Sequence, residues 1–281
     1  MRKERTVGCT AIDSLIHTQA GNGPSAFIAD PEILGGRKVA VCIGDSITRG
    51  QVSCNYVEML QAELGSDFRF VNAGINGELS FNVLDRLDEV ARCNPDCVTI
   101  LIGTNDAHAM IDRGSLKRAR RYITSAESPS VESFAENLRK IVSRLQERTG
   151  ARIALLSIPP IGEELGDHAM GIASRFRRAA EEVARGCGVA YLPLFEEMTA
   201  VLERSGRRSN GRVGYSDLLL VGNLIRARLL RLSYDAIAAR RRFVLHTDLL
   251  HLSCTGAAII TGLIASFLRR EWPLPSNGGG S

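Results

Sequence analysis

Four short polar segments of the chain contain the residue types that a serine hydrolase requires. Ser46 follows an apolar run in the segment GDSITRG, and near the C-terminus Asp248 and His251 stand with two leucines between them. A serine hydroxyl attacks an ester only when an imidazole accepts its proton and a carboxylate orients that imidazole and stabilises its cation. The sequence therefore predicts Ser46 as nucleophile, His251 as general base and Asp248 as the orienting carboxylate.

The other two segments offer hydrogen-bond donors for the oxyanion that such an attack creates. They are NAGING at 72–77 and GTND at 103–106. We expect three donors: the backbone N–H of Ser46, the backbone N–H of Gly77 and the side-chain amide of Asn105. Glycine permits close approach of the backbone, and a neutral amide donates without adding a charge beside the histidine.

Neighbouring residues leave alternatives open. His246 is a rival base, but it precedes the apolar turn, so His251 is preferred. A metal site built from His246, Asp248 and His251 lacks further ligands at comparable spacing, so no metal is predicted. Asp106 is expected to be a structural hydrogen-bond partner rather than a catalyst. His108 is expected on the surface or in a loop, beside the oxyanion segment.

The apolar periodicity predicts elements that bring these segments together. Apolar runs predict strands and amphipathic spacing predicts helices, in alternation along the chain. Such alternation implies right-handed crossovers and a parallel sheet, and loops after successive parallel strands meet at one edge. The expected strands are 38–43, 68–71, 97–102, 152–158 and 189–192, and the expected helices are 56–64, 79–91, 130–148, 169–186 and 255–270.

One domain, 38–270, accounts for these elements. Residues 1–37 lack sustained periodicity and are expected to be a leader outside the core, and 271–281 a flexible tail. The minimal fold does not require 196–243, which we interpret as a helical insertion. It is either a core-packed helix with a solvated arginine face, a lid beside the site, or, over 213–243, a surface for a membrane or for self-association.

Composition narrows the class of protein. The chain has 281 residues, 44% hydrophobic and 23% charged, which is typical of a soluble globular protein. A net charge of +4, with arginines clustered late in the chain, does not indicate a nucleic-acid partner. Seven scattered cysteines predict free thiols in a reducing compartment, and the N-terminus lacks the apolar stretch of a signal peptide. We therefore expect a cytoplasmic protein.

The segments GDSITRG, NAGINGELS, LIGTND and DLLHLSCTG together resemble the SGNH, or GDSL-type, hydrolase family. Ser46, Gly77, Asn105 and His251 match its four namesake residues, and Asp248 falls on its aspartate. The resemblance implies a three-layer α/β/α sandwich with a parallel, flavodoxin-like five-stranded sheet. It also implies hydrolysis of esters, thioesters or acetylated carbohydrates without a cofactor. No G-x-S-x-G elbow surrounds the serine, which disfavours the α/β-hydrolase family.

Three departures from the family pattern limit the inference about substrate. Two leucines occupy the Asp248–His251 turn, where the family usually has a small or polar residue. Glu78 replaces a common aspartate, and the region 106–130 is longer and more basic than a minimal member needs.

The expected function is a serine esterase that hydrolyses a small-molecule ester of a small or medium acyl chain through an acyl-enzyme. The hydrophobic insertion favours such esters, and a single tryptophan disfavours the aromatic surfaces that usually bind carbohydrate. The alternatives are an acyltransferase or carbohydrate deacetylase on the same fold, or a non-catalytic module that binds a lipid or a partner.

Overall fold

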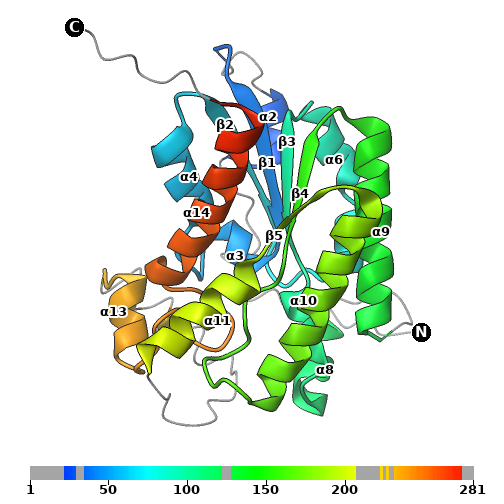
Figure 1. Cartoon of the computed structure of the whole chain (residues 1–281). Coiled ribbons are helices and arrows are strands. Elements are labelled where there is room, and N and C mark those ends of the chain that lie inside the picture. The colour runs from blue at the N-terminus through cyan, green and yellow to red at the C-terminus, as the bar shows by residue number, and fades with distance from the viewer. Residues whose placement is uncertain are drawn as a thin grey trace, which may run out of the picture.

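The computed structural model of the chain describes residues 22–29, 35–121, 128–206, 222–223, 226–227 and 231–273. Five parallel strands form one sheet in the order β2-β1-β3-β4-β5 (Figure 1). This order is that of the flavodoxin-like doubly wound sheet. The strands are β1 (Lys38–Gly44), β2 (Phe68–Gly74), β3 (Cys97–Leu101), β4 (Arg152–Leu156) and β5 (Ala190–Leu192).

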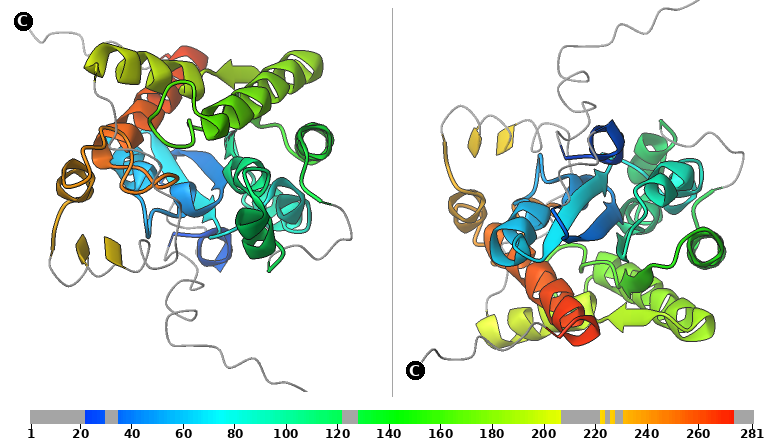
Figure 2. Two further views of the ribbon diagram at one scale, coloured as in Figure 1. Left: turned by 90° about the horizontal axis from the view of Figure 1, so that it is seen from below. Right: turned by 90° about the horizontal axis from the view of Figure 1, so that it is seen from above.

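Helices cover both faces of the sheet, as the two further views show (Figure 2). On one face α4 (Tyr56–Leu64) packs against α14 (Cys254–Glu271), which also contacts α11 (Leu194–Ser205). On the other face α9 (Val131–Arg148) packs against α10 (His168–Cys187), α5 (Ser80–Leu84) and α6 (Leu87–Arg92). The predicted three-layer α/β/α fold with a five-stranded parallel sheet is confirmed.

The interior strand β1 illustrates why these residues form this sheet. Its sequence KVAVCIG is apolar without alternation, and every residue after Lys38 is buried. Continuous apolar runs are typical of parallel strands that have helices on both faces. Because β1 pairs with β2 and with β3, its last residue is flanked by a strand on each side at the carboxyl end of the sheet.

One predicted helix is divided in two. The periodicity at 79–91 predicts a continuous helix, but α5 ends at Leu84 and α6 begins at Leu87. At the break, Arg86 forms a nearly buried ion pair with Glu78 and donates to Gly44 O at 3.2 Å. The ion pair draws this side chain towards the sheet edge, and hydrophobic spacing does not encode that contact.

The segments outside the predicted domain are described only in part. Within the predicted leader, α2 (Pro24–Ala29) contacts β2 and α6, and Phe27 is buried in the core. The predicted insertion begins within α11, whose buried Met198 and Leu202 belong to the core, and its later part includes α13 (Tyr234–Ala239). Most of the leucine-rich stretch lies outside the described residues, as does the tail from 274. Three further short helices are α3 (Ser46–Arg49), α7 (Thr104–Ala109) and α8 (Arg113–Ala119). None of the helices described here is long and apolar enough to cross a membrane.

Candidate active site

Ser46 is the first residue of α3 and is separated from the carboxyl end of β1 only by Asp45. The carboxylate of Asp45 caps this short helix by accepting from Ile47 N at 2.9 Å, and Gly50 ends it in the left-handed conformation, with φ of 72°. Gly44 precedes the turn because a side chain there would overlap Thr48 and Leu101 O. Ser46, the candidate nucleophile, is therefore held partly buried on a turn that is fixed on both sides.

The structure brings the three predicted triad residues into one hydrogen-bonded chain. His251 Nε2 lies 3.0 Å from Ser46 Oγ, and His251 Nδ1 lies 2.8 Å from Asp248 Oδ2. The second oxygen, Asp248 Oδ1, accepts from the backbone N–H groups of Leu250 and His251 at 2.7 and 2.8 Å. The carboxylate thus fixes both the ring and the backbone that carries it.

Electrostatics in the triad favour a charged carboxylate beside a basic imidazole. Burial raises the pKa of Asp248, but the charge of His251 and the hydrogen bonds from its ring and backbone outweigh burial and leave that pKa below its usual value. Burial likewise lowers the pKa of His251, and the charge and hydrogen bond of Asp248 reverse this and raise it above 6.5. Such a pair stabilises the imidazolium that proton uptake from Ser46 would create.

Asp45, the neighbour of the nucleophile, is buried, and burial raises its pKa to about 7, opposed by its hydrogen bond from Ile47 and by His251. Its Oδ2 accepts from the amide of Asn105 at a long 3.4 Å. The same amide donates to Glu78 O at 2.9 Å. Asn105, in the first turn of α7, therefore connects the segment of Ser46 with that of Gly77.

Gly77 lies in a turn after β2 with a φ of 77°, a conformation that L side chains rarely adopt. A nearly buried ion pair and a pair of buried hydrogen bonds hold this turn. Glu78 pairs with Arg86, and Asp106 accepts from the N–H and the hydroxyl of Ser80 at 2.9 and 2.7 Å. Asp106 is therefore a structural hydrogen-bond partner, as the sequence predicts.

The segment that carries Asp248 and His251 follows no strand of the sheet. It folds back on itself through an isolated antiparallel bridge between His246 and Leu252. Thr247 N donates to His251 O and Ser253 N donates to Leu245 O, both at 2.8 Å. Since the sheet does not position this loop, contacts with other segments must do so.

The rival base His246 is fully buried and does not lie beside Ser46. Its Nδ1 is 3.1 Å from Glu163 Oε1, and its Nε2 is 3.0 Å from Pro160 O. Both ring nitrogens are thus engaged on the side of β4. The structure places His251, and not His246, against the nucleophile.

His108 differs from its expected place in a loop. It lies in α7, is buried, and its Nε2 is 3.3 Å from Ser115 Oγ. Burial, with Arg118 nearby, lowers its pKa to about 4. A helix-forming stretch and a packed neighbour, α8, bury a residue that its polarity alone places at the surface.

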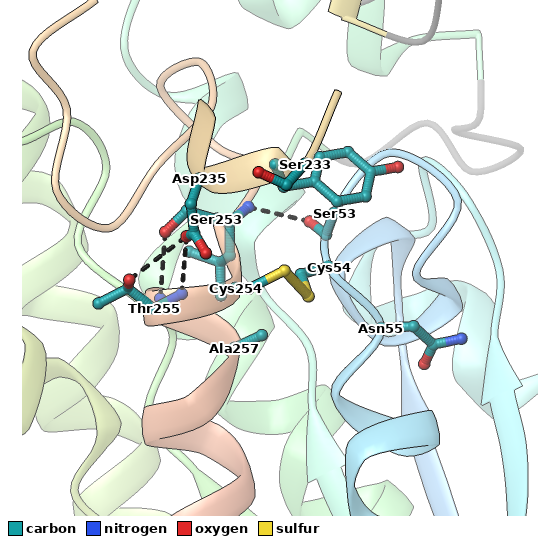
Figure 3. The surroundings of a disulfide bond; sticks show 12 residues. Ser53, Cys54, Asn55, Ser233, Asp235, Ser253, Cys254, Thr255 and Ala257 are labelled. Carbon is teal, nitrogen blue, oxygen red and sulfur yellow. Dashed lines mark hydrogen bonds between the residues drawn. A yellow bond between two sulfur atoms is a disulfide. The ribbon is translucent and has the colours of Figure 1, made fainter. Parts of the chain in front are cut away.

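A disulfide joins Cys54 to Cys254 beside the His251 loop (Figure 3). The expectation of free thiols is therefore wrong for these two cysteines, although Cys42, Cys93 and Cys97 are buried free thiols. The pair is separated by 200 residues, and only the fold brings the start of α14 next to the segment before α4. Because two of the cysteines are paired, cysteine usage no longer indicates a reducing compartment.

Two hydrogen bonds accompany the disulfide. Leu252 N donates to Ser53 Oγ at 3.0 Å, and Cys54 N donates to Leu252 O at 3.1 Å. The segment that follows Ser46 is thereby tied, covalently and through its backbone, to the residues that follow His251.

Glu163 also holds the site, although no sequence motif predicts it. It lies in the loop after β4 and accepts hydrogen bonds from the chain that leads to His251. One signal was available: Glu163 follows a predicted strand, at the sheet edge where the polar segments of the site also follow strands. Across the described residues there is no group of three His, Cys, Asp or Glu side chains that could hold a metal ion.

Two features define an ester hydrolase of the SGNH type: the fold, and a chain of two hydrogen bonds that runs from a serine through a histidine to an aspartate. The chain belongs to the GDSL-like lipase/acylhydrolase family, whose model matches residues 42–216. That span contains Ser46, Gly77 and Asn105. Asp248 and His251 lie beyond it.

Solved structures with this fold are similar to the chain at low identity. An acetyl xylan esterase, AlAXEase, has a TM-score of 0.61 at 17% identity, with 82% of this chain and 99% of that chain covered. Axe2, an acetylxylan esterase from Geobacillus stearothermophilus, has a TM-score of 0.58 at 18% identity, with 86% of this chain and 97% of that chain covered. A lipase/acylhydrolase from Enterococcus faecalis has a TM-score of 0.54 at 20% identity, with 83% of this chain and 96% of that chain covered. No curated protein matches the chain.

Proposed function

We propose that this protein is a serine esterase that hydrolyses carboxylic esters of small or medium acyl chains through an acyl-enzyme. One observation carries the proposal: Ser46 Oγ, the His251 ring and the Asp248 carboxylate form a chain of two hydrogen bonds at 3.0 and 2.8 Å. This is the arrangement in which an imidazole removes the serine proton during attack.

In the proposed reaction, Ser46 Oγ attacks the ester carbonyl while His251 Nε2 takes the hydroxyl proton. The tetrahedral intermediate expels the alcohol, which receives that proton from His251, and the acyl group remains on Ser46. Water then attacks the acyl-enzyme, with His251 again accepting a proton and returning it to Ser46 as the acid leaves. Asp248 keeps Nδ1 protonated and stabilises the imidazolium throughout.

We assign three donors to the binding of the oxyanion: the backbone N–H groups of Ser46 and Gly77, and Asn105 Nδ2. That amide nitrogen carries two hydrogens. The contact with Glu78 O at 2.9 Å holds the amide in place, whereas the contact with Asp45 Oδ2 is long, at 3.4 Å. The second hydrogen is therefore the one offered to the developing charge.

The position of the single tryptophan supports a small acyl ester over a carbohydrate. Trp272 packs edge-on against Phe68, with ring centroids 5.7 Å apart, and Lys38 lies over its ring. Lys38 and Phe68 begin β1 and β2, so this ring lies at the sheet edge opposite to Ser46. It is remote from any substrate bound there.

The test is hydrolysis of p-nitrophenyl esters from acetate to palmitate by the wild type, by Ser46→Ala and by Ser66→Ala. Ser66 is an exposed serine outside the site and serves as the matched control. We expect turnover with an optimum at short or medium chains, a loss of about 10⁴-fold or more in Ser46→Ala and no change in Ser66→Ala. Unaltered hydrolysis in Ser46→Ala would overturn the proposal.

Two further arms separate the alternative functions. Acetylated xylo-oligosaccharide as substrate tests a carbohydrate deacetylase, since acetylxylan esterases share this fold. Added alcohol as acceptor tests an acyltransferase through the yield of a new ester. A folded wild type that is inactive in all arms would favour the binding module.

A further inference from the structure

We propose that Glu163 and His246 form a buried ion pair that positions His251 and Asp248 for catalysis. The inference rests on the proposed esterase function. Both residues act through the backbone of the His251 loop, so they are positioning residues and do not touch the reacting atoms.

The Glu163 carboxylate accepts hydrogen bonds from three consecutive backbone N–H groups. Oε2 lies 2.8 Å from Val244 N, and Oε1 lies 2.7 Å from Leu245 N and 2.9 Å from His246 N. The Glu163 side chain is only 4% exposed. One buried carboxylate thus satisfies three amides that no strand partner reaches, and it fixes the course of the chain as the chain enters the loop.

The hydrogen bonds of His246 indicate that its ring carries a proton on each nitrogen. Pro160 O can only accept, so Nε2 must donate across the 3.0 Å contact. On the other side, Nδ1 is 3.1 Å from Glu163 Oε1, an oxygen that already accepts backbone N–H groups. Amide donors favour the ionised carboxylate, so Nδ1 donates as well and the pair is Glu163⁻ with His246⁺.

The pKa of Glu163 agrees with this assignment. Burial raises it, but the hydrogen bond and charge of His246 and the amides of Val244 and Leu245 outweigh burial and leave it below its usual value. An ion pair that shares a buried site with three amides has most of its polar atoms satisfied, which is the condition for keeping charges in a protein interior.

A short backbone path connects the Glu163–His246 pair to His251 and Asp248. His246 pairs with Leu252 in the antiparallel bridge, and the next residue, Thr247, donates from its N–H at 2.8 Å and its hydroxyl at 3.2 Å to His251 O. On the same side, Gly162 N, next to Glu163, donates to Leu249 O at 2.9 Å within the catalytic turn. Displacing 244–246 would therefore move His251 relative to Ser46.

A role in geometry explains why an ion pair occupies this place. Replacing a buried ion pair by apolar groups is often neutral for stability, so stability alone does not account for it. Small displacements of a general base from its nucleophile are costly for rate. The two carboxylate oxygens define the direction of three amides, which apolar packing cannot do.

The test compares Glu163→Gln, His246→Gln and the double variant with the wild type. Glutamine keeps the size of Glu163 but presents an NH₂ group to a site of N–H donors. Glu182→Gln, at an exposed residue of α10, is the matched control. We expect Glu163→Gln to lower kcat for p-nitrophenyl acetate by about 10- to 100-fold with KM within about twofold. The double variant should lose little more than Glu163→Gln alone, because the pair acts as a unit.

A second measurement separates positioning from folding and from the choice of substrate. The rate at which a fluorophosphonate labels Ser46 reports the Ser46–His251 geometry without an ester, and it should fall by a similar factor while thermal unfolding remains cooperative. Where Glu163→Gln does not fold, His246→Gln, which leaves the three amide contacts in place, should still slow labelling.

The outcomes distinguish this inference from the function on which it rests. A wild type that labels normally and whose kcat and labelling rate are unchanged in folded Glu163→Gln overturns the positioning role alone. A wild type that neither hydrolyses esters nor is labelled overturns the proposed function and this inference with it.

Discussion

The two halves of the proposed triad are held in place in different ways. Only Asp45 separates Ser46 from β1, which pairs with a neighbour along both sides, so the backbone ladder places the proposed nucleophile. His251 lies in a loop with one isolated bridge, and side chains from other segments hold it: Glu163, Ser53 and Cys54. Side-chain substitutions away from the catalytic residues should therefore disturb the base far more than the nucleophile.

Among the substitutions that test this comparison, removing the charge of Asp248 should lower kcat the most. We expect Asp248→Asn to lower kcat for p-nitrophenyl acetate by about 10⁴-fold, because His251 then loses the carboxylate that sets its tautomer and stabilises its cation. The exposed Asp85, replaced by Asn, is the control. A loss below about tenfold in the folded variant would show that Asp248 does not orient the base.

Removing the Asn105 amide should cost about 10²- to 10³-fold in kcat. The amide links the segments of Ser46 and Gly77 in the free protein and is assigned to the oxyanion during reaction. The loss should fall on kcat rather than on KM, and steady-state kinetics with a short-chain ester measure both. A change confined to KM would argue for a role in binding the ground state.

Breaking the disulfide should affect stability more than rate. We expect Cys54→Ser/Cys254→Ser to lower the free energy of unfolding by about 2–5 kcal/mol, because a long covalent loop is lost from the unfolded chain. The hydrogen bonds of Leu252 with Ser53 and Cys54 remain, so kcat should stay within about threefold. Urea unfolding of this variant and of Cys187→Ser, whose partly exposed thiol is free, checks the expectation. Identical unfolding midpoints would contradict it.

The smallest expected effect is an upward shift of the acid limb in the pH profile of kcat/KM. The base must be neutral to accept the proton of Ser46, so activity falls as pH drops through the pKa of His251. Burial lowers that pKa, but Asp248 outweighs burial and raises it, so the midpoint should lie above 6.5. Rates measured from about pH 5 to 9 locate the limb. A midpoint below 6.5 would mean that burial dominates.

The sequence was sufficient to predict the sheet and to select Ser46, His251 and Asp248, which the structure brings together, and the reason is local. Apolar runs end directly at the polar segments, so strand prediction places Ser46 and Asn105 at one edge, and the short spacing of Asp248 and His251 keeps them together. The disulfide and the Glu163 anchor depend on proximity between distant segments. Neither the Cys54–Cys254 spacing nor the polarity of Glu163 encodes that proximity, and the break before Arg86 is likewise set by a tertiary ion pair.

The bond between Cys54 and Cys254 also makes most of the protein a covalent ring. β2, β3, β4 and β5 lie between the two cysteines, whereas β1 with Ser46 precedes the ring and α14 follows from it. A single peptide-bond cleavage anywhere between the two cysteines would leave nucleophile and base in one covalent molecule. A protease-nicked sample should therefore run as one chain until it is reduced, and as two fragments afterwards.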